Sequence, residues 1–179
     1  MKIFVHNRQT RRRPNVRKLA TLARFFMLQA ARRPPECPWA EVSVVLTDDA
    51  GITPVNRTFL DHARATDVIT FTLAPMPGGG AGTCGEIHLN VERALEEGAR
   101  RGGSTALTTD NAADELALYL AHGCDHLTGA NDRTRMEQRR MRRRELLWIQ
   151  RARRVGLMEG LWAATKDRSG AMPNSKKRR

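Results

Sequence analysis

Four short segments with the composition of β-strands are spread along the chain, and most of the stretches between them have helical periodicity. The strand candidates are rich in β-branched and apolar residues and span 2–7, 41–47, 67–73 and 85–91. Helices are expected around residues 14–31, 52–60, 92–101, 111–126 and 133–154. Strands interrupted by helices over connections of unequal length predict an α+β fold, in which about five helices pack on one mixed four-stranded sheet. The order of the strands stays open.

The length of the chain sets its domain organisation. With 179 residues and 40% hydrophobic content, the chain can build one core but not two. We expect a single small domain over residues 1–154, followed over 155–179 by a basic C-terminal extension that is predicted to be disordered. No run of about eighteen apolar residues is present that could span a membrane. The three cysteines lie far apart in the sequence and are expected to be reduced thiols rather than a disulfide framework. These features favour a cytoplasmic protein without a membrane partner.

The formal net charge of +12 favours an anionic partner, and for a small basic protein that partner is most often nucleic acid. Arginine clusters at 11–13 and in the last predicted helix could follow an RNA backbone. The second cluster gives the RNA-binding candidates Arg139, Arg140, Arg142, Arg143 and Arg144. The alternative is that these side chains are simply solvated on an exposed helix face.

The segment HGCDHLTGAND, residues 122–132, has the spacing of a metal site. His122 and His126 are four residues apart, so on a helix their imidazoles lie on one face. Gly129 can adopt the left-handed conformation that turns the chain back, which would bring the carboxylate of Asp132 to the same point. We therefore predict a metal site at the end of a core helix, with His122, His126 and Asp132 as ligands. The alternative is that both histidines are ordinary half-buried polar residues.

Three protein ligands with one open position are typical of a catalytic zinc site. We expect one Zn2+ per chain, and the carboxylate of Asp132 widens the choice towards iron or manganese because it lowers the charge of the metal centre. A zinc peptidase of the H-E-x-x-H type is excluded, since Gly123 stands where such an enzyme needs a glutamate. Gly123 also leaves room beside the metal for substrate or backbone. Asp125 is expected on the helix surface.

Three ordered blocks of the chain resemble the YbeY family of metal-dependent endoribonucleases, which mature ribosomal RNA in bacteria. HGCDHLTGAND resembles the family signature H-G-x-L-H-L-x-G-x-D-H. VNRTFLDHARATDVITF, residues 55–71, resembles the segment LN-x-x-[YF]-R-x-x-D-x-x-TDVLSFP. CGEIHLNVERALEEGARR, residues 84–101, resembles the family's LGDI strand and the helix after it. The resemblance runs from about residue 41 to residue 147.

By this resemblance, His122 and His126 take the places of two zinc ligands, and Asp132 stands where the family usually has a third histidine. Glu86 takes the place of the aspartate in the family's strand. Glu86 is therefore the candidate general base or a hydrogen-bond partner of the metal ligands. The alternative is a purely structural role as a capping or strand-edge residue.

Leu60 occupies the position of an arginine that the family uses in RNA cleavage. Arg57 and Arg64 are therefore the candidates to supply that charge. Thr66 and Asp67 are expected to fix the loop before the third strand rather than to touch RNA.

The resemblance implies a single-strand-specific metallo-endoribonuclease that acts in 16S ribosomal RNA 3′-end maturation and late ribosome quality control. The implied partners are ribosomal RNA and the small ribosomal subunit, with ribosomal proteins or a GTPase as candidate guides. The alternative, motivated by Leu60 and Asp132, is a ribosome- or rRNA-binding maturation factor in which the metal is mainly structural and cleavage is weak or lost.

Overall fold

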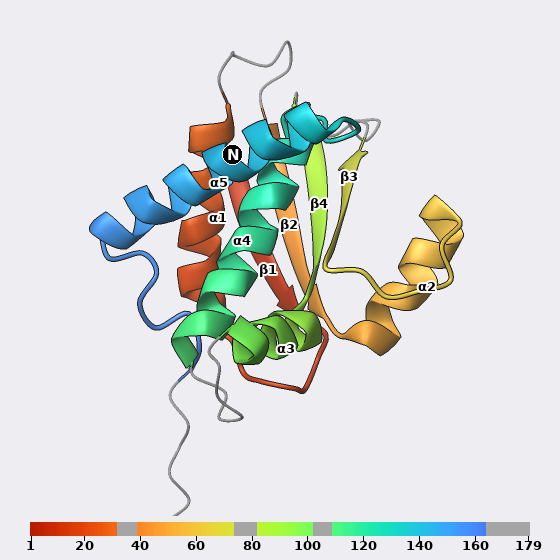
Figure 1. The fold of residues 1–179 in the computed structure, drawn as a ribbon, viewed down its shortest axis with the longest axis horizontal. Helices are drawn as coiled ribbons and strands as arrows, with labels where there is room; N and C mark the ends of the chain where they lie inside the picture. The colour runs from red at the N-terminus through yellow and green to blue at the C-terminus, as the bar shows by residue number, and fades with distance from the viewer. Residues whose placement is uncertain (32–38, 74–81, 102–108, 164–179) are drawn as a thin grey trace, which may run out of the picture.

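A computed structural model describes residues 1–31, 39–73, 82–101 and 109–163 (Figure 1). The elements that it defines are β1 (Lys2–Asn7), α1 (Val16–Ala30), β2 (Trp39–Thr47), α2 (Asp49–Leu60), β3 (Val68–Leu73), β4 (Thr83–Asn90), α3 (Val91–Arg101), α4 (Thr109–Leu127) and α5 (Arg135–Arg154). The expected α+β class, with four strands and five helices, is confirmed within these residues.

The four strands form one mixed sheet in the order β1-β2-β4-β3. β1, β2 and β4 run parallel, and β3 joins the edge of β4 in the antiparallel direction. Ile87 of β4 lies opposite Val44 of β2 and Thr70 of β3, so these three side chains share one face of the sheet. Glu86, next to Ile87 in the strand, points to the other face because side chains alternate along a strand.

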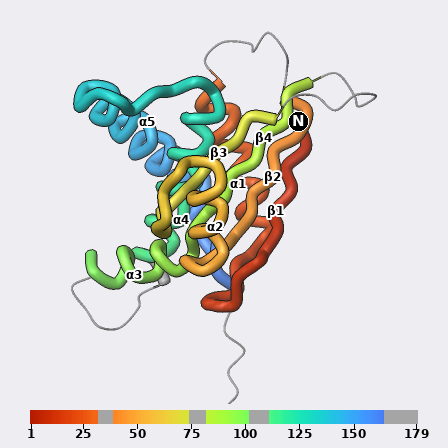
Figure 2. The backbone as a smooth tube through the Cα atoms, turned by 90° about the vertical axis from the view of Figure 1, so that its right-hand side faces the viewer, coloured from red at the N-terminus to blue at the C-terminus, as the bar shows by residue number. Residues whose placement is uncertain are grey.

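Helices α1 and α4 cover the first face, and α5 packs against both of them on the outside. Figures 1 and 2 show this layer on one side of the sheet and α2 on the other. The core follows from the alternation of inward and outward side chains along the strands. The inward residues of β2 and β4 are fully buried and form one hydrophobic cluster with the apolar stripe of α1. This core includes Val42, Val44, Leu46, Ile87, Leu89, Leu19, Leu22 and Phe26.

The helix boundaries follow from capping residues. Asn15 and Asp48 each accept a hydrogen bond from a backbone N–H of the first turn of α1 and α2. Thr134 and Glu137 form a complete capping box at the start of α5. α2 ends at Asp61, which has a φ of 56°.

The folded part of the chain extends beyond Arg154, where the sequence analysis ended the domain. Leu161 and Trp162 are buried in the core, and the backbone of residues 161–163 bonds to residues 13–15 before α1. The C-terminal extension therefore begins after Ala163 at the earliest. Residues 164–179 and Cys37 lie outside the described residues. No helix among the described residues is long and apolar enough to cross a membrane.

Candidate metal centre

Helix α4 lies unusually close to the sheet at the point where the candidate ligands begin. A Cβ on Gly123 would lie 2.7 Å from Cγ2 of Ile87, and a Cβ on Gly85 would lie 2.9 Å from Cδ1 of Leu127. Both contacts are shorter than real Cβ atoms show, so a larger residue at either position would force its neighbours to shift. The cost is greater at Gly123, because Cγ2 of Ile87 is attached directly to Cβ, next to the β4 backbone. The space that Gly123 leaves is thus filled by β4 and β3 rather than by substrate. This close approach of α4 to the sheet fixes how far His122 lies from the strands.

The chain reverses after α4 as the sequence predicts. Gly129 has a φ of +88°, and its N–H donates to the carbonyl oxygen of His126. Ala130 N–H donates to the carbonyl oxygen of Asp125. This turn directs the following residues back toward the helix end, where Asp132 lies.

The three predicted ligands meet at one point. Nε2 of His122 and Nε2 of His126 are 3.0 Å apart, and Oδ2 of Asp132 is 3.9 Å from Nε2 of His126. One ligand atom from each residue lies within 4.8 Å of the other two. All three residues are half-buried. The three residues that the sequence pattern singled out thus lie close enough to share one metal ion.

The hydrogen bonds of the two imidazoles fit a cation at this point. Nδ1 of His126 is 3.1 Å from the carbonyl oxygen of Ala130, which can only accept, so Nδ1 carries the proton. Nδ1 of His122 is 2.6 Å from Oε1 of Glu145, and an ionised carboxylate also only accepts. Both neutral rings then present bare Nε2 lone pairs to each other at 3.0 Å. Only a proton or a metal ion between them makes this arrangement favourable.

Glu145, on α5, is the acceptor that orients the first ligand. It is 2% exposed and contacts His122 across the helix interface. Burial lowers the pKa of His122, but the hydrogen bond and the charge of Glu145 outweigh this, and the pKa is raised above its ordinary value. A carboxylate behind a ligating histidine fixes its tautomer and makes the ring a stronger ligand.

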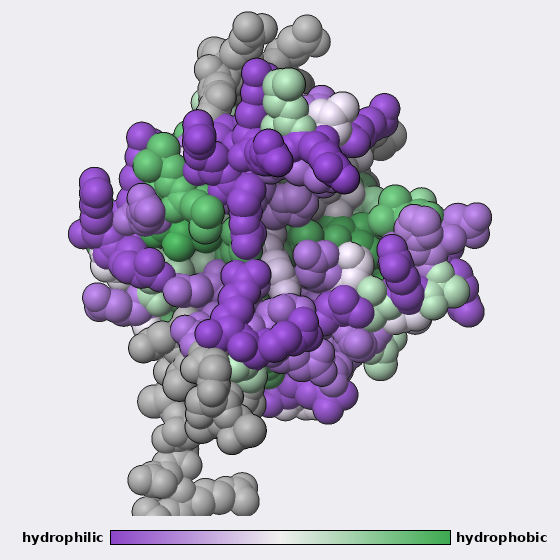
Figure 3. All heavy atoms as spheres, in the orientation of Figure 1, coloured by the Kyte–Doolittle hydropathy of each residue, from purple (hydrophilic) through white to green (hydrophobic). Residues whose placement is uncertain are grey.

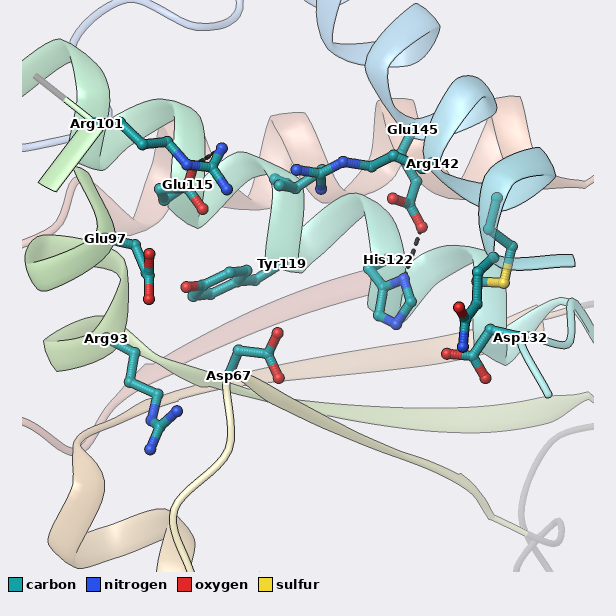
Figure 4. A pocket seen from close by; sticks show the side chains of 13 residues that line it. Asp67, Arg93, Glu97, Arg101, Glu115, Tyr119, His122, Asp132, Arg142 and Glu145 are labelled. Carbon is teal, nitrogen blue, oxygen red and sulfur yellow. Dashed lines mark hydrogen bonds and ion pairs between the residues drawn. The ribbon is translucent and has the colours of Figure 1, made fainter. Parts of the chain in front are cut away.

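Two of the candidate ligands, His122 and Asp132, line a cleft of about 470 Å3 between α3, α4 and α5. Figure 3 shows hydrophilic residues gathered on both sides of this region, over α5 and α3. Figure 4 shows the acidic and basic side chains that line the cleft. Three arginines face five carboxylates, which leaves a formal charge of −2 when His122 is neutral. That charge suits a divalent cation. The charged lining consists of Asp67, Glu97, Glu115, Asp132, Glu145, Arg93, Arg101 and Arg142.

The end of the cleft away from the ligands is closed by an ion pair between Arg101 and Glu115. Burial raises the pKa of Glu115, and the nearby charges of Arg101 and Arg142 oppose the rise. Burial also raises the pKa of Tyr119, which stays a neutral phenol on the floor of the cleft.

The structure does not bring Glu86 to the ligands. Its carboxylate is 2.6 Å from Nε2 of His88, on the face of the sheet that α2 covers. His122 lies on the opposite side, because α4 packs against Ile87 and not against Glu86. Glu86 is therefore separated from the ligands by the sheet itself.

Arg57 and Arg64 also lie away from the cleft. Both are exposed, one on α2 and one in the loop after it, and neither is part of the cleft lining. Leu60, in the position of the family's arginine, is 49% exposed on α2. In the described part of the chain, the cleft takes its arginines from α3 and α5 instead.

The five arginines of α5 that were expected to bind RNA fall into three groups. Arg139, Arg140 and Arg143 are exposed, and Arg142 lines the cleft. Arg144 instead binds Oδ2 of Asp125 with Nε and Nη2, at 3.1 and 2.6 Å.

The Arg144 contact corrects the expectation for Asp125. This carboxylate is 4% exposed and belongs to the α4–α5 interface, not to the helix surface. Burial of a carboxylate requires a charged partner, and Arg144 is that partner.

Sequence reasoning missed Glu145 and the place of Asp67 in the cleft. A signal for Glu145 existed, because it lies four residues after Met141 and four before Ile149, on the buried stripe of α5. An acidic residue on a buried stripe needs a partner, and a histidine on a neighbouring helix is one candidate. No comparable signal marked Asp67.

Comparisons with known proteins agree with the ordered blocks of the sequence. A family model described as Endoribonuclease YbeY matches residues 4–152. A protein named Endoribonuclease YbeY from Cytophaga hutchinsonii is 35% identical over 59% of this chain, and the match spans 66% of that protein, just under two thirds. Another of that name, from Geobacter metallireducens, is 33% identical over 81% of this chain and 91% of that protein. A solution structure from Thermotoga maritima superposes with a TM-score of 0.49 and 21% identity, over 87% of this chain and 94% of that one.

Proposed function

The chain belongs to the YbeY endoribonuclease family, and from that premise we propose that it is a metal-dependent endoribonuclease specific for single-stranded RNA. We propose that its substrate is 16S ribosomal RNA, cleaved in 3′-end maturation and in late ribosome quality control. One observation carries the proposal: two bare imidazole nitrogens and a carboxylate converge in a cleft that also presents arginines.

His122, His126 and Asp132 would hold one divalent ion, for which we propose zinc, with iron or manganese as alternatives. When bound, the ion supplies a Lewis acid for the phosphodiester. The protein holds the ligands in place for that purpose. Glu145 fixes the His122 ring from α5, and the carbonyl of Ala130 fixes the His126 ring.

Arg142 takes the role first assigned to Arg57 and Arg64. It reaches from α5 into the cleft, and within the described residues it forms no ion pair. Figure 4 shows its side chain running along the cleft between Glu115 and His122. In the proposed reaction its guanidinium binds the phosphate next to the cleaved bond and stabilises the charge that develops there.

The exposed arginines of α5 extend this basic surface outside the cleft. Arg139, Arg140 and Arg143 would contact the phosphates of the flanking RNA. The proposed partners are ribosomal RNA and the small ribosomal subunit in the cytoplasm, with ribosomal proteins or a GTPase as guides.

One observation favours a second function. Leu60 leaves α2 without the family's arginine, and both neighbouring arginines lie outside the cleft. A ribosome- or rRNA-binding maturation factor, with a mainly structural metal and little cleavage, would tolerate that loss.

Cleavage separates the two functions. Purified protein is incubated with a labelled single-stranded fragment of the 16S 3′ region and, separately, with its duplex, in zinc, manganese or iron. His122→Ala, prepared in parallel, is the control for contaminating nuclease. The enzyme is expected to cut only the single strand and only with His122 intact. RNA binding without cleavage in any of the three metals would establish the second function instead.

Metal content tests the ligand set directly. Elemental analysis of the wild type is expected to give about one ion per chain, and Asp132→Ala is expected to give much less. If Asp132→Ala keeps its metal, another group completes the site.

A further inference from the structure

The cleft contains one carboxylate that neither holds the candidate ion nor pairs with a cation. Asp67 precedes β3 and lines the same cleft as His122 and Asp132. It is not part of the group whose ligand atoms lie within 4.8 Å of one another. Figure 4 shows its carboxylate directed into the cleft, between Tyr119 and His122.

The other four carboxylates of the cleft are engaged. Asp132 belongs to the ligand group, and Glu145 holds His122. Glu115 is paired with Arg101, and Glu97 lies 3.0 Å from Arg100. Among the described residues, Asp67 has only neutral hydrogen-bond donors, so its charge is not compensated by an ion pair.

These neutral donors fix the orientation of Asp67. Its Oδ1 accepts a hydrogen bond from Oγ1 of Thr66 at 2.9 Å and from the backbone N–H of Val68 at 3.0 Å. Its carbonyl oxygen accepts from the N–H of Asn90 in β4 at 2.8 Å. Within the described residues, Oδ2 receives no hydrogen bond. The loop that was expected only to support β3 therefore also presents an open carboxylate oxygen to the cleft.

We infer that Asp67 is the general base of the proposed cleavage reaction, in place of Glu86; this inference rests on the proposed function. In the step, Oδ2 takes a proton from a water molecule as the water oxygen bonds to phosphorus. The P–O bond to the leaving ribose oxygen breaks, and that oxygen takes a proton from solvent. Asp67 then returns its own proton to solvent, so the net reaction is hydrolysis of one phosphodiester.

The test compares Asp67→Asn with Glu86→Gln and Glu96→Gln. Asparagine keeps an acceptor for Thr66 and Val68 but cannot take a proton, so the loop is preserved. Glu96 is exposed on α3 outside the cleft lining, and its variant is a control for the loss of one negative charge. For each protein we would measure kcat and KM for single-stranded RNA, RNA affinity without cleavage, and metal content.

Asp67→Asn is expected to lower kcat by about 100-fold or more, since general base catalysis contributes roughly 10²–10⁴-fold. Metal content and RNA affinity should match the wild type, and both control variants should keep their activity. Formate is expected to restore part of the activity of Asp67→Ala, because it replaces the missing carboxylate. If Asp67 had only a structural role, formate would not restore the activity of Asp67→Ala.

Two outcomes would overturn the inference while leaving the proposed function intact. One is an active Asp67→Asn, which beside an inactive Glu86→Gln would return the role of base to Glu86. The other is a loss of metal from Asp67→Asn equal to its loss of activity. If the wild type itself cleaves no RNA, the proposed function fails, and the inference fails with it.

Discussion

At the scale of single residues, Glu145 connects the candidate ligands to the rest of the fold. It is almost fully buried, it comes from a helix that carries no ligand, and its 2.6 Å contact fixes the His122 ring. Without this contact, the ring could flip about its Cβ–Cγ bond, which would replace Nε2 by a carbon atom at the candidate metal position. The ligand geometry thus depends on the packing of α5 against α4.

Replacement of Glu145 by glutamine should weaken metal binding. An amide oxygen is a poorer acceptor than a carboxylate, and loss of such a partner typically costs 10–100-fold in metal affinity. We expect a decrease of that size for Glu145→Gln, measured by competition with a chelator of known affinity. Glu159→Gln, which changes an exposed glutamate, is the matched control. Equal affinities for the two variants would show that the contact does not support the ligand.

The convergence of His122, His126 and Asp132 could be predicted from the sequence, whereas only the buried stripe of α5 hinted at Glu145 and nothing marked Asp67. His122, His126 and Asp132 fall within one helix end and one turn, so local geometry brings them together. Glu145 and Asp67 reach the cleft only through the packing of other elements. Glu86 was the candidate general base because of its place in a family motif, but it lies on the face of β4 opposite the one that α4 covers.

At the scale of elements, the contact between α4 and the sheet depends on Gly123. Because a Cβ there would lie 2.7 Å from Ile87 and 3.3 Å from both Thr70 and Val68, a larger residue must push the helix away from β4 and β3. The same shift would move the first ligand relative to Asp67, which is attached to β3.

Gly123→Ala is therefore expected to destabilise the protein. Overpacking of this kind costs about 1–3 kcal/mol, which exceeds the gain of up to about 1 kcal/mol from replacing a helical glycine. The free energy of unfolding in urea measures the net effect. In an Ile87→Ala background the clashing methyl group is absent, so the same substitution should cost less. An identical cost in both backgrounds would rule out this contact as the cause.

The elements themselves were predicted to within a few residues, because periodicity and capping residues are local signals. The strand order was left open, since it depends on pairing between distant segments. The domain boundary at Arg154 was too early because residues 155–163 have no periodicity, yet they place Leu161 and Trp162 in the core. Their burial is decided by α1 and the segment before it, not by their own sequence pattern.

At the scale of the whole molecule, the charge is divided between an acidic cleft and a basic exterior. The chain has a net charge of +12, whereas the cleft lining has a formal excess of carboxylates. RNA would therefore be attracted by the outer surface and would enter the cleft only where a cation and Arg142 offset the carboxylates.

The exposed arginines of α5 are expected to account for a measurable part of the salt dependence of RNA binding. Replacing Arg139, Arg140 and Arg143 together by alanine should make the plot of log K against log salt concentration shallower by about 0.7 per lost contact. The measurement is a fluorescence titration with single-stranded RNA at several salt concentrations. Arg17→Ala, an exposed arginine on α1, is the control, and an unchanged slope in the triple variant would exclude this surface from RNA binding.

The pairing of residues 13–15 with residues 161–163 has a consequence for the order of folding. It joins segments that lie almost at opposite ends of the described chain, through Pro14 and Trp162 and the backbone bonds beside them. Contacts so distant in sequence gain little from local structure and must overcome a large closure entropy. The pairing of these two segments is therefore expected to form after the sheet and α4 have folded. It is also expected to be among the first contacts of the native state to break on unfolding.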